Sequence, residues 1–359
     1  MNRSLALRFM VCTIRRRLER RLTAKQGPAG DLMAQSTNKI QKERITLLND
    51  EKSRAGDYVL YWMQQSQRAE CNHALEYAVQ RANHLDKPLL VAFGLMDDYP
   101  EANERHYRFM LEGLQQTQRQ LEQRGIAFTL RHGAPVDVVC ELACDACMVV
   151  CDRGYLRHQR AWRTDLAKRV ECEVVEVEAD AVAPVETTSQ KREYAARTIR
   201  PKITRLLDRF LIDLRTTPLE RDALSLKPGG LDLGDLDGVV AGLKIDRSVP
   251  AVSWRFRGGA PAARAALKEF VDNRLKHYQE HRARAETDDI SHMSIYLHFG
   301  QISPLYVALQ IRGARRGSAE DRDSYLEELL VRRELSLNFV WFERHYDAYT
   351  CLPDWAKKT

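Results

Sequence analysis

The sequence lacks any apolar run long enough to cross a membrane, and its hydrophobic residues come in short stretches. It also lacks low-complexity segments and a secretory signal with an apolar core and cleavage site. With 359 residues, 44% of them apolar and 30% charged, the composition is that of a globular protein of about two domains. We therefore expect a cytoplasmic protein with no membrane partner.

An excess of basic charge is confined to the N-terminus. The net charge of +6 is carried entirely by residues 1–35, which hold eight Arg/Lys and two Asp/Glu. Any binding of nucleic acid must therefore depend on local patches elsewhere. The segment is either a transit-type peptide or a non-folding extension, with Met33 as an alternative start, and its few serines favour the extension. We expect residues 1–55 to be basic and disordered.

Eight cysteines without a secretory signal indicate reduced thiols and not a disulfide framework. Cys140, Cys144 and Cys147 have CxxxCxxC spacing, which can hold an iron–sulfur cluster. Here the spacing covers the end of a predicted helix and the start of a predicted strand, which do not bring three sulfurs to one point. Core cysteines are therefore favoured over the cluster, and no metal site is predicted.

Five short apolar runs alternate with amphipathic helices. The runs are residues 58–63, 88–95, 126–133, 148–152 and 172–180. This alternation predicts βαβ units and a parallel sheet. The first strand–helix junction, WMQQSQRAECNHAL, has no GxGxxG, so the usual dinucleotide fingerprint is missing. We expect its helix to begin with Arg68 and Glu70.

A Pro/Thr/Ser linker at residues 181–195 is followed by helical periodicity over residues 196–359. The expected fold is therefore α/β: a Rossmann-like parallel-sheet domain at residues 56–180, then an all-helical domain. The start of the helical part is rich in basic residues, which form either a phosphate-binding patch or a solvated helix face. They are Lys191, Arg192, Arg197, Arg200, Lys202 and Arg205.

The stretch SHMS, Ser291 to Ser294, precedes a short predicted helix. Ser291 is placed to cap that helix, and helix N-termini expose unpaired N–H groups that bind phosphate. His292 can donate to an anion, with Arg333 and Lys276 as charge partners. The alternative is that the serines only cap the helix.

Four motifs in order carry a resemblance: YVLYWMQQSQRAECNHAL, KREYAARTIRPKI, MSIYLHFGQISP and EELLVRRELSLNF. Together they resemble the class II cyclobutane pyrimidine dimer photolyases of the photolyase/cryptochrome family, over residues 57–359. The resemblance implies that the helical domain binds FAD. The implied cofactor-binding residues are Tyr278, Ser291, His292, Met293, Ser294, Arg333 and Asn338. Glu328 and Arg332 are the implied substrate-binding residues.

The implied activity is that of a carbon–carbon lyase, a deoxyribodipyrimidine photo-lyase. It repairs pyrimidine dimers in UV-damaged DNA by light-driven electron transfer from reduced FAD, after base flipping. The cofactor carries the chemistry, so no catalytic side chain is assigned. An antenna chromophore, a deazaflavin or a folate, and a monomeric state are also expected. Two alternatives stay open: a cryptochrome-like flavin photosensor without repair, and an inactive fragment with only the α/β domain folded.

The sequence departs from the family pattern at three places. Arg332 stands where some relatives carry a tryptophan, and Leu337 replaces an acidic residue. Both substitutions concern contacts with the substrate more than flavin binding. Family members also continue with further helices after the segment that matches DWAKK, so we expect a FAD-binding domain that is truncated at its C-terminus.

Overall fold

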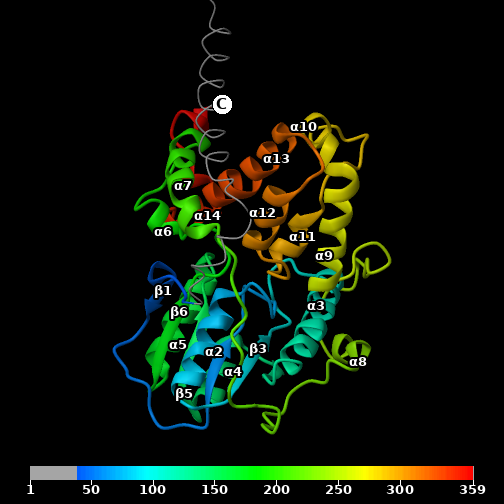
Figure 1. Ribbon diagram of the computed structural model, residues 1–359. Helices are drawn as coiled ribbons and strands as arrows, with labels where there is room; N and C mark the ends of the chain where they lie inside the picture. The colour runs from blue at the N-terminus through cyan, green and yellow to red at the C-terminus, as the bar shows by residue number, and fades with distance from the viewer. Residues whose placement is uncertain (1–38, 359) are drawn as a thin grey trace, which may run out of the picture. The chain divides into compact units, whose positions relative to one another are not determined.

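The computed structural model describes residues 39–358, and the basic segment at residues 1–35 lies outside them. Within the described residues an α/β domain is followed by a helical domain (Figure 1). None of the helices described there is both long and apolar enough to span a bilayer.

The α/β domain is built on a six-stranded sheet with the order β1-β6-β5-β2-β3-β4. The strands are β1 (Ile45–Leu47), β2 (Tyr58–Trp62), β3 (Leu89–Leu95), β4 (Ala127–His132), β5 (Ala146–Asp152) and β6 (Glu173–Val177). Strands β2 to β6 are parallel, which confirms the predicted parallel sheet.

The edge strand β1 was not predicted. It pairs antiparallel with β6 and lies in the segment 1–55 that was expected to be disordered. That expectation is wrong for residues 45–47, because three residues without an apolar run give no strand signal in the sequence.

Helices cover both faces of the sheet. The helices α2 (His73–His84) and α3 (Glu104–Glu122) pack on one face, and α4 (Pro135–Ala143) and α5 (Arg157–Arg169) pack on the other. Burial on both faces explains why the central strands are continuously apolar.

The loop after β2 is longer than predicted. Helix α2 begins at His73 and not at Arg68, because the Asn72 side chain accepts hydrogen bonds from the N–H groups of Ala74 and Leu75. Arg68 and Glu70 therefore lie in the loop between β2 and α2.

The predicted linker at residues 181–195 is largely buried and contains the short helix α6 (Val185–Thr188). Glu334 accepts hydrogen bonds from the backbone N–H groups of Val182 and Ala183, and Arg44 donates to the carbonyls of Ala181 and Val182. The segment is therefore part of the interior, although its composition is typical of a linker.

The first helix of the helical domain is followed by a segment that packs on the α/β domain. After α7 (Ala196–Phe210), residues 211–250 return to the α/β domain, and α8 (Leu236–Ala241) packs on α3. Leu214, Leu231 and Leu233 join the apolar core beside α2 and α3. The predicted helical domain at residues 196–359 therefore contains a segment that belongs to the α/β core.

The rest of the helical domain consists of short helices (Figure 1). They are α9 (Ala260–Glu269), α10 (Tyr278–His281), α11 (Met293–His298), α12 (Pro304–Gly313), α13 (Ala319–Leu326) and α14 (Arg333–Phe342). Two segments with π-helical hydrogen bonding, Phe270–Arg274 and Glu327–Arg332, interrupt what the sequence predicts as long helices. Such segments are frequent at functional sites.

The cysteines with CxxxCxxC spacing lie along α4 and β5. Cys147 is buried in β5, and Cys144 is exposed at the end of α4. Among residues 39–358 no three His, Cys, Asp or Glu side chains are grouped so that they could hold a metal ion. The prediction of core cysteines therefore holds for Cys147 and is wrong for the exposed Cys144.

Candidate functional site

A cavity of about 790 Å³ lies at the carboxyl ends of β2 and β3. One side is formed by residues of α3 and α5, and the other by residues of α11 and α14. Strands β3 and β5 lie on opposite sides of β2, so the strand order reverses there. Open α/β sheets bind their ligands at such a point. The volume lies within the range of small-molecule and cofactor sites.

Most of the cavity wall is apolar or aromatic. Trp62, Phe93, Tyr99, Tyr155 and Trp162 supply large rings. The polar side chains are few and include glutamines, histidines, Ser294, Asp180 and Arg333. This wall suits a large planar ligand that is held in place by a few polar contacts.

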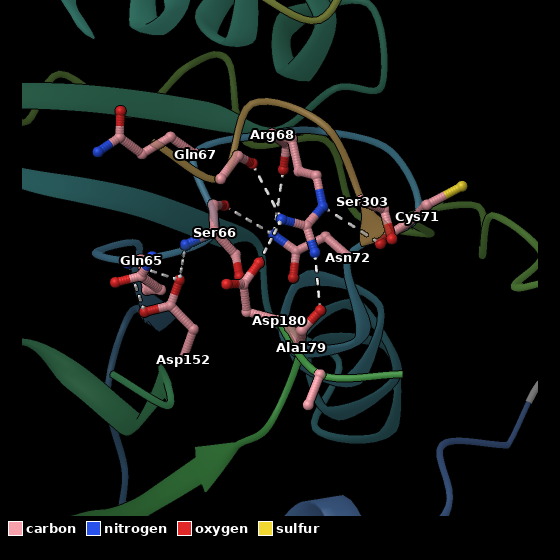
Figure 2. A network of polar contacts seen from close by, with 12 residues as sticks. Gln65, Ser66, Gln67, Arg68, Cys71, Asn72, Asp152, Ala179, Asp180 and Ser303 are labelled. Atoms are coloured by element: carbon pink, nitrogen blue, oxygen red, sulfur yellow. Dashed lines mark hydrogen bonds and ion pairs between the residues drawn. The ribbon is translucent and has the colours of Figure 1, made fainter. Parts of the chain in front are cut away.

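The N–H groups at the end of β2 are already occupied. The carboxylate of Asp152, the last residue of β5, accepts hydrogen bonds from the N–H groups of Gln64, Gln65 and Ser66 (Figure 2 labels the last two). Tyr61 also donates to it, at 3.2 Å. A carboxylate of the protein thus occupies the donors that in many nucleotide-binding folds bind a phosphate. This accounts for the missing glycine-rich loop.

Several polar atoms of the cavity wall are buried without a partner. Within the described residues, both amide atoms of Gln64, Oε1 of Gln67 and Oδ1 of Asp180 have no hydrogen-bond partner. Buried polar groups in native proteins are nearly always satisfied, so these atoms are available to a ligand of the cavity.

Asp180 connects the two domains at the cavity. Its Oδ2 accepts a hydrogen bond of 2.7 Å from Arg333 on α14, and its Oδ1 lies 3.7 Å from Arg68 (Figure 2 shows the Arg68 side). Burial raises the pKa of Asp180, although both guanidinium groups act in the opposite direction. Burial likewise lowers the pKa of the nearby His298, which favours a neutral imidazole.

The predicted loop residues Ser291 to Ser294 occupy different environments. Only Ser294, the second residue of α11, lines the cavity. The hydroxyl of Ser291 pairs with that of Tyr325, Met293 is buried in the core, and His292 pairs with Asp288 at 2.7 Å. The helix begins at Met293, with His292 in the left-handed conformation before it, so Ser291 is not its N-cap.

Of the three remaining predicted cofactor residues, Arg333 lines the cavity and the other two do not. Tyr278 packs against Tyr325, with ring centroids 5.1 Å apart, outside the cavity wall. The Asn338 amide is buried and binds the backbone of the segment predicted as a linker. It accepts a hydrogen bond from the N–H of Glu193 and donates one to the carbonyl of Lys191.

The two predicted substrate residues lie on the π-helical segment Glu327–Arg332, and neither belongs to the cavity wall. Glu328 accepts a 2.7 Å hydrogen bond from Arg282, and both side chains are about 40% exposed. Arg332 is exposed and lies 3.5 Å from Glu327.

The basic patch is partly neutralised by the protein itself. Arg192 pairs with Glu343, Arg200 with Glu327 and Lys202 with Glu193. The other three, Lys191, Arg197 and Arg205, form no ion pair with an acidic side chain of residues 39–358. Only half of the patch is therefore available to an external anion.

Sequence reasoning missed the polar residues of the α/β half of the cavity, above all Gln64, Gln67 and Asp180. Glutamines after a strand carry no recognisable motif. The available signal was position, since Gln64 follows the first predicted strand, Asp180 is the last residue of the fifth, and parallel strands end at one edge of the sheet.

Comparison with known proteins agrees with this architecture. The family model described as DNA photolyase matches residues 59–222. The chain is 44% identical over 322 residues to the deoxyribodipyrimidine photo-lyase of Methanothermobacter thermautotrophicus, covering 89% of this chain and 70% of that protein.

Two solved structures show the same fold. The class III photolyase of Agrobacterium tumefaciens matches with a TM-score of 0.62 and 20% identity, over 81% of this chain and 60% of that one. The photolyase of Sulfolobus tokodaii with two FAD molecules matches with a TM-score of 0.61 and 16% identity, over 80% and 60% of the two chains. From the fold, the cavity and the identity to the Methanothermobacter enzyme together, we conclude that the chain belongs to the DNA photolyase family.

Proposed function

We propose that this protein is a deoxyribodipyrimidine photo-lyase of class II that binds FAD in the cavity and repairs pyrimidine dimers in DNA. The observation that carries the proposal is the cavity between the two domains, with its unsatisfied polar atoms, in a chain 44% identical to an enzyme of that name. The chain spans about 60–70% of the lengths of these relatives.

The residues of the cavity fit a flavin dinucleotide. Aromatic and aliphatic side chains provide surfaces for stacking, and the unpaired carboxylate oxygen of Asp180 matches a hydrogen-bond donor of the heterocycles. Ser294 and Arg333, a hydroxyl on α11 and a guanidinium on α14, are the predicted cofactor residues that line the cavity and suit phosphate oxygens. The chemistry that reduced FAD would supply when bound is the light-driven transfer of an electron to the dimer.

The protein's own part is to position the reactants and to exclude water. Arg333 is fixed by Asp180, so its guanidinium is held in place before a ligand arrives. Glu328 is an acceptor for the bases of a flipped dimer, and Arg282 holds its carboxylate in one orientation. Lys191, Arg197 and Arg205 supply charge for DNA phosphates. We expect the protein to act as a cytoplasmic monomer.

The α/β half of the cavity suits the antenna chromophore. Gln64 and Gln67 offer unpaired amide atoms there, and Gln159 donates to Gln65 at 2.9 Å. Because Asp152 occupies the neighbouring N–H groups, an uncharged ring such as a deazaflavin or a folate pterin fits this wall better than a phosphate group.

The proposal is tested on the purified 359-residue chain by visible absorption and by flavin content after denaturation. Near-stoichiometric FAD and light-dependent repair of a dimer-containing oligonucleotide are expected. Ser294→Ala should weaken FAD binding, whereas Ser336→Ala, on the exposed side of α14, should not. FAD binding without preference for damaged DNA would favour a flavin photosensor, and a chain that binds no flavin would contradict the proposal.

A further inference from the structure

Asp180 is a buried hydrogen-bond acceptor in the cavity wall whose role neither the motifs nor the comparisons assign. Its side chain is 3% exposed. Arg333 donates to its carbonyl oxygen at 2.8 Å and to Oδ2 at 2.7 Å. No donor in the described part of the chain is hydrogen-bonded to Oδ1.

Arg68 gives Oδ1 a positive charge nearby but not a hydrogen bond. Its Nη1 lies 3.7 Å from Oδ1 and donates to the carbonyl of Gly300 at 2.9 Å. Its Nη2 donates to the carbonyl of Ala179 at 2.8 Å (Figure 2). Arg68 is thus committed to the backbone of both domains, which leaves Oδ1 charged, buried and able to accept.

Two other buried carboxylates of the α/β domain accept hydrogen bonds from several donors of the protein. Asp152 accepts from three backbone N–H groups and a tyrosine hydroxyl. Glu76, on α2, accepts from Arg124 at 2.8 Å and from the N–H of Thr217 at 2.6 Å. Both carboxylates have their hydrogen-bond donors within the protein. Oδ1 of Asp180, a residue of the cavity wall, has none among the described residues.

We propose that Asp180 is a ligand-binding residue of the cavity. Its Oδ1 accepts a hydrogen bond from an N–H or O–H group of the cofactor, while its Oδ2 holds Arg333 beside the same ligand. This role rests on the proposed function, in which the cavity holds FAD. A carboxylate only accepts, so it selects an imide, amine or hydroxyl edge and repels phosphate oxygens. Phosphate would accordingly lie nearer Ser294.

The test is titration of the flavin-free 359-residue chain with FAD, followed by flavin fluorescence. Asp180→Asn should weaken FAD binding by roughly tenfold or more, since a hydrogen bond to a charged group is lost. The control is Glu76→Gln, which also alters a buried carboxylate and should lower the melting temperature without changing the affinity for FAD.

A double-mutant cycle separates direct contact from positioning. If Oδ1 contacts the ligand, Asp180→Asn weakens binding further in the Arg333→Gln background. No further loss would overturn the direct contact and leave only the positioning of Arg333. If these variants do not fold, infrared difference spectra of the ¹³C-aspartate-labelled wild type with and without FAD should show a shifted carboxylate band, and an unchanged band would overturn the proposal.

The outcomes for the two proposals differ. If the wild type binds FAD and Asp180→Asn binds it equally well, the role of Asp180 is wrong and the proposed function stands. If the wild type binds no FAD, the proposed function is wrong and the role of Asp180 falls with it.

Discussion

The carboxylate of Asp152 accepts a 2.6 Å hydrogen bond from the backbone N–H of Ser66. Asp152 is the last residue of β5 and Ser66 follows the neighbouring parallel strand β2, so the contact fixes the loop that carries Gln64 and Gln67 into the cavity wall. The same carboxylate accepts from the N–H groups of Gln64 and Gln65, so one side chain determines the shape of this edge of the site.

Asp152→Ala should therefore destabilise the chain by about 3 kcal/mol or more, because the buried N–H of Ser66 and the part-buried N–H groups of Gln64 and Gln65 lose their acceptor. Urea unfolding followed by circular dichroism measures the effect. The exposed Asp145→Ala is the control and should change stability by less than about 0.5 kcal/mol. Equal stability of the two variants would contradict the structural role of Asp152.

Glu334 should make stability depend on pH. Burial raises its pKa to about 8, with Arg333 acting in the opposite direction, whereas the unfolded chain has the ordinary value of 4.5. The folded chain thus keeps a proton that the unfolded chain has released, and this contribution is complete below about pH 4.5. It is lost as the pH rises towards about 8. Glu334→Gln should flatten the decline of melting temperature over this range, and the exposed Glu286→Gln should leave it unchanged.

Gly300 should tolerate no side chain. It has a φ of +63°, and a Cβ there would overlap the carbonyl oxygen of Gln65, where α11 ends against the loop after β2. Gly300→Ala should cost about 2 kcal/mol or more in stability. Gly313→Ala, at the end of α12 and with open space around it, should be neutral or slightly stabilising in the same thermal unfolding experiment.

The unpaired half of the basic patch should govern the salt dependence of DNA binding. Replacing Lys191, Arg197 and Arg205 with alanine should weaken binding to damaged and undamaged duplexes alike. It should also reduce the slope of log K against log salt by about 1 for each DNA phosphate that the variant no longer neutralises. Fluorescence anisotropy at several salt concentrations gives the slope. An unchanged slope would mean that this surface does not touch DNA.

The parallel sheet was predictable because its strands are buried on both faces and therefore appear as continuous apolar runs. The burial of residues 181–195 was not, since Val182 and Ala183 are fixed by Glu334, more than 150 positions away. Ser294 and Arg333 could be selected from motifs. For Asp180 the sequence offers only a position at the end of the fifth predicted strand, because its hydrogen bond with Arg333 joins residues 153 positions apart.

The return of residues 211–250 to the α/β domain has a consequence for folding. Leu231 and Leu233 cover apolar surface beside α2 and α3, and this segment lies between α7 and α9 in the sequence. Neither half can be excised with its interior intact, so a cut near residue 185 would leave an α/β domain without part of its core. The two halves should therefore melt in a single calorimetric transition, because the chain passes from the α/β domain to the helical domain, back again, and then returns.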